Sequence, residues 1–296
     1  MNSLRLAAPW MAGWLSLMVI LAVAGREATG ELPVFEVMEI RSLIGLLMLL
    51  PMIRASGGRE SLRSRRLPLH IVRNAFHYSA QLGWFFALTM IPLSQLVAIE
   101  FTMPIWTALL AAGFLGERLN VWKIAAVVFG LIGVALIVRP STAGANIGQL
   151  IALAAAVGFA ISLTMTKSLT GTENPAGIIF WMLLLQSAIG LLPALAVWKW
   201  PSPAVWGWLL VIAFCGTYSH YCMARAMRHA DATVVVPMDF LRVPLTALAG
   251  WLVYAERIDL LTVLGTLMIL GGNLLNLPGA RRRPAVTPPA DSAARR

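Results

Sequence analysis

The chain has few charged side chains and almost no cysteine. Charged residues make up only 12% of its 296 positions, against about 25% in an ordinary soluble domain, whereas hydrophobic residues make up 59%. A soluble globular core is therefore excluded. The two cysteines, Cys215 and Cys222, lie seven positions apart in one apolar run and share a helix face. We interpret them as small packing residues rather than as a disulfide framework or a metal site.

Motifs for nucleotide hydrolysis and for peptide or ester hydrolysis are also absent. The sequence has no G-x-x-x-x-G-K-[ST] loop, so the chain alone cannot use ATP. It has neither H-E-x-x-H nor G-x-S-x-G, and no cysteine–histidine cluster has the spacing of metal ligands. We therefore predict no enzyme, no metal and no cofactor. An integral-membrane enzyme or a non-transporting sensor is the alternative from a different functional class.

Apolar runs of roughly 17–23 residues, about the length of a helix that crosses a bilayer, fill most of the sequence. Ten such runs fit, separated by short loops, so we expect an all-α integral membrane protein without a separate soluble domain. Residues 280–296, rich in Pro, Ala and Arg, are expected to form a disordered basic tail. The predicted spans are 9–25, 35–53, 69–90, 94–115, 122–138, 147–166, 176–197, 205–225, 233–254 and 261–277.

The net charge of +10 is distributed unevenly along the chain. Most of the 23 Lys and Arg residues fall on one side of the predicted membrane, and only Arg26, Arg139, Lys199 and Arg257 fall on the other side. This asymmetry follows the positive-inside rule and places both termini in the cytoplasm, with the chain in the inner membrane. The charge thus orients the protein in the lipid bilayer, and we do not expect nucleic acid as a partner.

The first span also allows a second interpretation. Arg5 before the apolar run and the letters AVAG before Arg26 are typical of a cleavable signal peptide. Cleavage would leave nine spans. An internal repeat favours keeping the segment as a membrane span.

A shift of 139 residues aligns the two halves of the sequence. Glu117 falls on Glu256, and Gly133 falls on Gly272. The shift carries spans one to five onto spans six to ten, and because five is odd, the second copy must cross the membrane in the opposite sense. Such an inverted repeat is typical of carriers that work by alternating access. It also removes the need for a partner chain to supply the other half, so a monomer is sufficient.

These segments resemble a known family. The run ALTMIPLSQLVAIEFTMPIWTALLAAGFLGERL, followed by GLIGVALIVRP, resembles the EamA repeat of the drug/metabolite transporter superfamily, and YAERIDLLTVLGTLMILGG resembles it more weakly. EIRSLIG is similar to the arginine-bearing second helix of the family, whereas the charges in MDFLRVP depart from the usual pattern. The resemblance covers about residues 9–277. It implies ten-helix carriers of small metabolites, among them amino-acid exporters of the YddG type, with repeats at 1–140 and 141–279.

The two repeats carry an acid at equivalent positions within their apolar runs. The shift maps Glu100 in VAIEF onto Asp239 in VPMDF. A charge in the middle of a bilayer costs about 2.5–3.5 kcal/mol, so each acid needs a partner, water or a proton. Arg242 is the candidate partner of Asp239, three residues away, whereas Glu100 has no such neighbour. The acids are expected on opposite sides of the midplane, either as structural ion pairs or in amine binding, proton coupling or gating.

Arg41 is the other buried charge that requires a partner. Glu39 lies two residues away and therefore on a different face of the helix. We expect Arg41 to pair across helices, and Glu100 is one candidate. Arg41, Glu39 and Arg242 are thus predicted to form gating or structural charge pairs.

One face of span 69–90 is polar, from His70 and Arg73 to Trp84, at helical spacing. Lipid cannot satisfy these groups, so the face must contact other helices or water. We predict His70 and Arg73 to be interfacial anchors and the deeper residues to be cavity wall. Pro104 and Pro237 lie beside the two acids, where a kink exposes backbone carbonyls. The predicted substrate-binding residues are Glu100, His77, Tyr78, Gln81, Trp84, Trp181, Tyr218 and Asp239.

The sequence therefore predicts a secondary transporter that moves a small polar or zwitterionic metabolite by alternating access. Amino-acid export is the leading prediction, because paired acids beside aromatic side chains suit an ammonium group. Uptake of another metabolite, such as a vitamin or a nucleoside-like compound, is the alternative within the transporter class.

Overall fold

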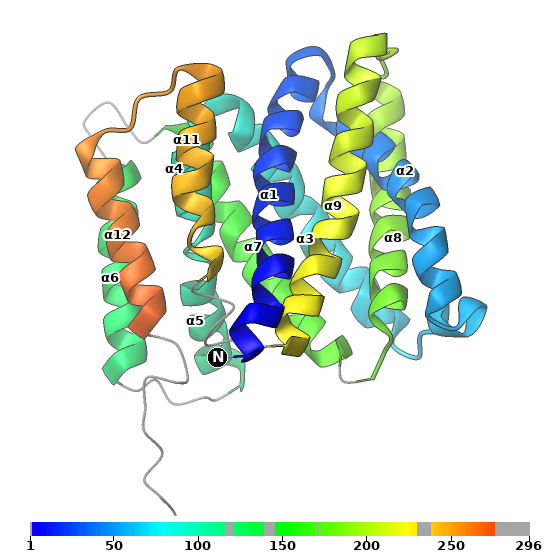
Figure 1. Ribbon diagram of the computed structural model, residues 1–296, viewed down its shortest axis with the longest axis horizontal. Coiled ribbons are helices and arrows are strands. Elements are labelled where there is room, and N and C mark those ends of the chain that lie inside the picture. The colour runs from blue at the N-terminus through cyan, green and yellow to red at the C-terminus, as the bar shows by residue number, and fades with distance from the viewer. Residues whose placement is uncertain (1, 116–120, 139–145, 171, 230–237, 276–296) are drawn as a thin grey trace, which may run out of the picture.

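The chain folds into a bundle of long helices, shown as a computed structural model in Figure 1. Every secondary-structure element of the described residues is an α-helix or a short 3-10 helix, which confirms the predicted all-α class. The predicted tail 280–296 lies outside the described residues, which are 2–115, 121–138, 146–170, 172–229 and 238–275. The helices are α1 (Asn2–Glu31), α2 (Val34–Ala55), the 3-10 helix η1 (Gly58–Leu62), α3 (Leu67–Met90), α4 (Leu93–Glu100), α5 (Met103–Leu115), α6 (Val121–Val138), α7 (Ile147–Thr170), α8 (Pro175–Ala196), α9 (Pro203–His229), α11 (Arg242–Tyr254) and α12 (Leu260–Leu275).

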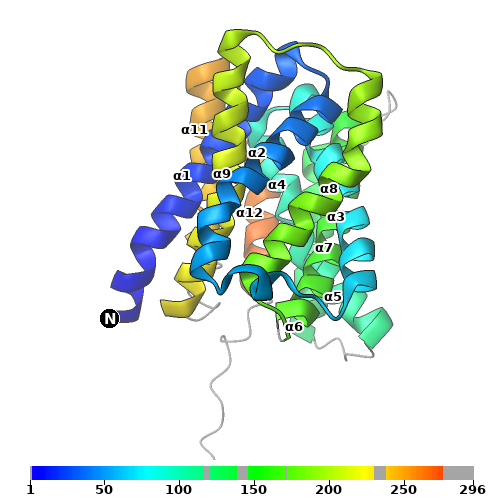
Figure 2. The same cartoon turned by 90° about the vertical axis from the view of Figure 1, so that its right-hand side faces the viewer.

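Ten spans run alternately up and down the bundle, so the chain is a multi-pass membrane protein (Figures 1 and 2). The fourth span consists of α4 and α5, and the ninth ends in α11. By length and composition alone, three described stretches are long and apolar enough to cross a membrane: Leu6–Glu31, Ile147–Thr166 and Ala176–Ala196. The other spans are shorter, interrupted or richer in polar groups. Those polar groups face neighbouring helices, because lipid offers them no hydrogen bond.

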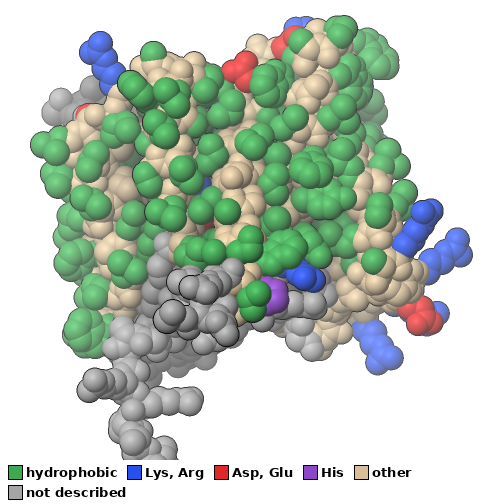
Figure 3. All heavy atoms as spheres, in the orientation of Figure 1, with side chains coloured by type: hydrophobic (Ala, Val, Ile, Leu, Met, Phe, Trp, Pro, Cys, Tyr) green, Lys and Arg blue, Asp and Glu red, His purple; other side chains and the backbone are tan. Residues whose placement is uncertain are grey.

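The flank of the bundle is covered by hydrophobic side chains, as Figure 3 shows. Large apolar residues such as Leu192, Leu47 and Leu260 are exposed there, with 76%, 68% and 71% of their surface accessible. An apolar surface of this extent is costly in water and is satisfied by lipid. In the same view most of the visible Lys and Arg side chains gather at the end of the bundle that also holds the N-terminus (Figures 1 and 3).

The two halves pack against each other reciprocally. Under the 139-residue shift, α1 corresponds to α7 and α3 corresponds to α9. In the structure α1 packs along α9, and its counterpart α7 packs along α3. Two further contacts join counterparts directly, since α2 packs on α8 and α6 packs on α12. This reciprocity is the inverted repeat that the sequence predicts, arranged about a pseudo-twofold axis.

Glycines let the backbones of α6 and α12 approach closely. A Cβ atom on Gly265 would lie 2.5 Å from the carbonyl oxygen of Gly133, and a Cβ on Gly133 would lie 2.6 Å from the carbonyl oxygen of Gly265. Gly272 meets the carbonyl oxygen of Ala126 in the same way, at 2.8 Å. Small residues are the usual means by which membrane helices pack tightly. These positions fix the α6–α12 pair at one edge of the bundle (Figure 1).

The fourth span, predicted over 94–115 with a kink beside Pro104, is interrupted at that point. α4 ends at Glu100, Phe101 and Thr102 form a turn, and α5 begins at Met103. The cause is Pro104, which has no N–H to bond the carbonyl of Glu100 and is tolerated in the first turn of α5. The ninth span has the same break, with a turn at Phe240 and Leu241 before α11. Pro237 lies outside the described residues.

The lower part of the polar face of α3 contacts the end of α7. His70 Nε2 lies 2.6 Å from Glu173, which also accepts a hydrogen bond of 2.6 Å from Ser64. Burial would raise the pKa of Glu173, but these hydrogen bonds outweigh it and hold that pKa below its usual value. His70 is fully buried and Arg73 is 5% exposed, so neither is the interfacial anchor that we predicted.

Replacing Gly265 by Ala should destabilise the bundle, because the new methyl group would overlap the backbone of Gly133. We expect a loss of about 1–3 kcal/mol from overpacking, seen as a lower midpoint of thermal unfolding of the detergent-solubilised protein. Gly271→Ala is the control on the same helix, since nothing lies within 4 Å of its added Cβ. Equal midpoints for the two variants would contradict the close α6–α12 contact.

Candidate functional site

The two helix breaks each place an acidic side chain inside the bundle. Glu100 is the last residue of α4, and Asp239 lies in the helical turn before α11. Phe101 and Phe240 follow them directly, and their rings meet edge to face with centroids 5.5 Å apart. Since α4 packs on α11, the breaks of the two repeats lie against each other.

Arg242, the first residue of α11, joins the two acids. Its Nη1 lies 2.9 Å from Glu100 Oε1, and its Nε lies 3.5 Å from Asp239 Oδ1. The guanidinium also lies over the ring of Phe101, 4.8 Å from the centroid. We name Glu100, Asp239 and Arg242 the acidic centre. Two carboxylates against one guanidinium give it a net charge of −1 when all three are ionised.

Each acid of this centre also accepts a hydrogen bond from an indole. Trp84 Nε1 on α3 donates to Glu100 Oε2 at 2.9 Å, and Trp14 Nε1 on α1 donates to Asp239 Oδ1 at 2.5 Å. These contacts bring α1 and α3 to the two breaks. Both acid side chains are 14% exposed, so they are shielded but not sealed.

The arrangement corrects one expectation. The sequence offered Arg41 as a partner of Glu100, but the partner is Arg242 in the ninth span. The placement of Glu100 and Asp239 on opposite sides of the midplane stays a prediction, and the two acids lie close enough to reach one guanidinium.

Arg41 lies in a separate polar cluster between α2, α3 and α8. Its Nη2 donates to Gln81 Oε1 at 2.7 Å and to Gln186 Oε1 at 3.2 Å. The residue is 5% exposed and has no carboxylate within ion-pair distance among the described residues. Gln81 lies one turn before Trp84 on α3, so this helix connects the cluster to the acidic centre.

Glu39 also belongs to the cluster but does not pair with Arg41. Its Oε1 accepts a hydrogen bond from Ser187 on α8. Its Oε2 and the hydroxyl of Tyr78 both face Gly190, where a Cβ would lie 2.9 Å from the carboxylate and 2.8 Å from the hydroxyl. Gly190 thus makes room for two polar groups inside the bundle.

Three other predicted site residues lie apart from both centres. His77 Nδ1 faces Ser162 on α7 at 3.3 Å. Tyr218 donates to the carbonyl oxygen of Met48 at 3.2 Å. Trp181 donates to the carbonyl oxygen of Leu62 at 3.0 Å and stands beside His70, at the end of the bundle. Two residues that we did not predict as site residues contribute instead. Trp14 belongs to the acidic centre, and Gln186 belongs to the cluster around Arg41. The only sequence signal for either was a polar or aromatic residue inside a span.

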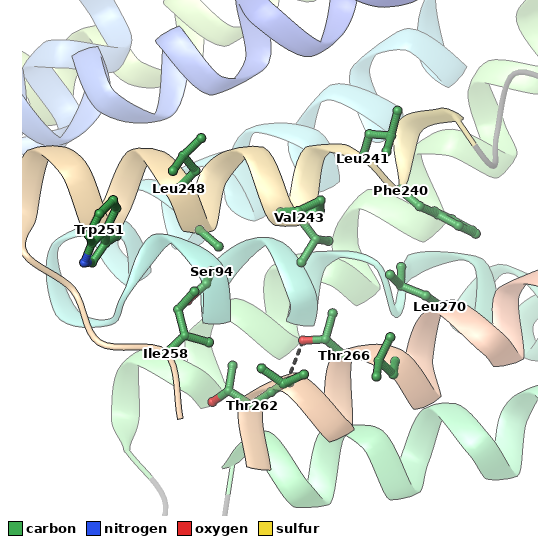
Figure 4. A pocket seen from close by; sticks show the side chains of 14 residues that line it. Ser94, Phe240, Leu241, Val243, Leu248, Trp251, Ile258, Thr262, Thr266 and Leu270 are labelled. Atoms are coloured by element: carbon green, nitrogen blue, oxygen red, sulfur yellow. Dashed lines mark hydrogen bonds between the residues drawn. The ribbon is translucent and has the colours of Figure 1, made fainter. Parts of the chain in front are cut away.

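An apolar cavity of about 630 Å³ opens beside the acidic centre, between α4, α11 and α12 (Figure 4). Phe240 lines one end of it and Trp251 the other, with Thr262 and Thr266 among its few polar residues. Leu241 and Leu267 on its walls are more than half exposed on the flank of the bundle. The cavity is therefore suited to apolar groups, and the charged chemistry lies next to it rather than within it.

The chain matches the model of the EamA-like transporter family twice, over residues 6–139 and 146–277. A riboflavin transporter of Brucella anthropi is 32% identical over 238 residues, which cover 78% of this chain and 84% of that protein. An S-adenosylmethionine uptake transporter of Rickettsia prowazekii is 25% identical and covers 81% of each chain. The pseudopaline exporter CntI of Pseudomonas aeruginosa is 28% identical over 83% of this chain and 86% of that protein.

A solved crystal structure has the same fold. It superimposes with a TM-score of 0.65 over 91% of this chain and 96% of that chain, at 20% sequence identity. At this identity the likeness concerns the fold alone.

Removing Arg242 should destabilise the protein strongly, because two partly buried carboxylates would lose their common partner. For Arg242→Met we expect a loss of about 3–5 kcal/mol, measured by thermal unfolding in detergent. Arg257→Met, at an exposed position, should change the stability by no more than about 0.5 kcal/mol. Adding Glu100→Gln and Asp239→Asn to Arg242→Met should restore most of the loss. A triple variant as unstable as the single one would show that the charges do not account for it.

Proposed function

Because the chain belongs to the EamA-like transporter family, we propose that it is a secondary carrier of a small amphoteric metabolite and that its acidic centre binds the cationic group of that metabolite. The family and the relatives identify a transporter rather than an enzyme. The finer assignment rests on one observation, the excess of one negative charge at Glu100, Asp239 and Arg242 where the two repeats meet.

The groups around the acidic centre suit an amine or another cation. The carboxylates supply charge-assisted acceptors, and Phe101, Phe240 and Trp84 supply aromatic faces within the same shell. Pro104 leaves the carbonyl of Glu100 without its helical N–H partner. Interrupted helices whose freed carbonyls face a site are a recurring design of secondary transporters.

Amino-acid export is the first candidate within this class, because an α-amino acid carries the ammonium group that the acidic centre suits. The second candidate is uptake of a nucleoside-like or vitamin-like metabolite. It is favoured by the relatives named for riboflavin and for S-adenosylmethionine uptake. Both of these compounds contain a flat heteroaromatic ring, which the apolar cavity beside Phe240 would accommodate.

Purified protein in liposomes should carry at least one of radiolabelled tryptophan, methionine, riboflavin and S-adenosylmethionine. Glu100→Gln should reduce that transport at least tenfold, because the neutral amide offers no charge to the cationic group. Glu60→Gln, an exposed carboxylate of η1, is the matched control and should transport at the parental rate. If Glu100→Gln only lowers the yield of protein and transports normally, Glu100 is structural. If no compound moves faster than into empty liposomes, the carrier proposal fails.

We also propose that the chain lies in the inner membrane with both termini in the cytoplasm. Arg59→Cys and Trp200→Cys, on a background without Cys215 and Cys222, place one thiol at each end of the bundle. A membrane-impermeant maleimide added to spheroplasts should label Trp200→Cys alone. Inside-out vesicles should give the opposite result. Labelling of Arg59→Cys in intact spheroplasts would invert the proposed orientation.

A further inference from the structure

The buried arginines of this protein differ in their electrostatic compensation. Arg242 is paired with two carboxylates, and the partly buried Arg26 is paired with Glu256. Arg41 and Arg73 are both 5% exposed, and their partners among the described residues are neutral. A buried charge without a counter-charge is costly, so its retention needs an explanation.

Arg41 differs from Arg73 in how completely its nitrogens are used. Arg73 Nε donates to Thr166 at 2.8 Å, and its Nη1 and Nη2 contact Asn74 and Met182. Arg41 Nε is buried and has no partner among the described residues, and its Nη1 lies 3.4 Å from where a Cβ at Gly216 would be. The backbone of α9 therefore approaches the guanidinium to within ordinary van der Waals contact of one methyl group.

Further buried donors surround Arg41 without a partner. The amide Nε2 of Gln186 and the hydroxyl of Tyr78 are both buried and make no hydrogen bond to a described residue. Gln186 is fully buried and Tyr78 is 4% exposed. They come from α8 and α3, whereas Arg41 comes from α2. At Gly190 the Tyr78 hydroxyl stands beside an unpartnered acceptor, Glu39 Oε2, so the donors that remain for an anion are the Arg41 guanidinium and the Gln186 amide.

We propose that Arg41, together with Gln186, binds the acidic group of the transported metabolite, a carboxylate or a phosphate. The assignment rests on the proposed carrier function and completes it, because the acidic centre lies one turn of α3 away, through Gln81 and Trp84. The Arg41 guanidinium and the acidic centre have opposite charge. A metabolite with a basic and an acidic group would satisfy both.

Benzoate and benzamide form a matched pair of probes for this site, since they differ in one negative charge. The full-length protein in phosphatidylcholine nanodiscs should be stabilised by benzoate and not by benzamide, at constant ionic strength, because a bound ligand raises the unfolding midpoint. In Arg41→Gln the half-saturating benzoate concentration should rise at least tenfold. Arg73→Gln removes an equally buried charge and should keep the benzoate response.

Several outcomes would overturn the assignment. They are a parent without a benzoate response, an equal response to benzamide, and an unchanged response in Arg41→Gln. Phosphatidylglycerol nanodiscs test whether a lipid phosphate is the occupant instead, in which case that lipid stabilises the parent through Arg41 and benzoate has no effect. Failure of the carrier proposal is distinguishable, because an Arg41-dependent benzoate response without any flux in liposomes would keep the anion site and remove only the transport assignment.

Discussion

The contact between Arg242 and Glu100 is the interaction on which the interior of this protein depends. A lone charge within a bilayer costs several kcal/mol, and two acids close enough to share one guanidinium would also repel each other. One guanidinium between them removes most of both penalties. Arg242 reaches both acids because α4 ends at Glu100 and α11 begins at Arg242. The ion pair therefore depends on the two helix breaks.

Two groups of opposite charge contact helix α3 at different points along its length. Trp84 on this helix bonds the net negative acidic centre, and Gln81, one turn earlier, bonds the uncompensated Arg41. Neither centre neutralises the other by direct contact, although their charges are opposite. A direct ion pair between Arg41 and Glu100 would have neutralised both charges and served only as a structural bridge. The observed separation is what the proposed binding of one small molecule by both groups requires.

The sequence predicted the architecture of the protein more completely than it predicted which side chains contact each other. The 139-residue offset identified the inverted repeat and the equivalence of Glu100 with Asp239, because repetition leaves a signal in the residues themselves. The polar face of α3 was also predictable, since helical spacing is a local property. The partner of Glu100 was not, because Arg242 lies 142 positions away and reaches it only through the packing of α4 on α11. Trp14 joined Asp239 for the same reason.

The position of Arg242 within the repeats determines which acid can change its partner. The repeat equivalent of Arg242 is Met103, so one arginine serves two acids. Asp239 lies three residues before Arg242 in the same repeat and moves with it, whereas Glu100 belongs to the other repeat. Any motion of one repeat against the other therefore alters the 2.9 Å contact with Glu100 and leaves the local contact with Asp239 largely unchanged. We propose that, in an alternating-access cycle, Glu100 is the acid that a cationic group competes for and Asp239 keeps the guanidinium in place.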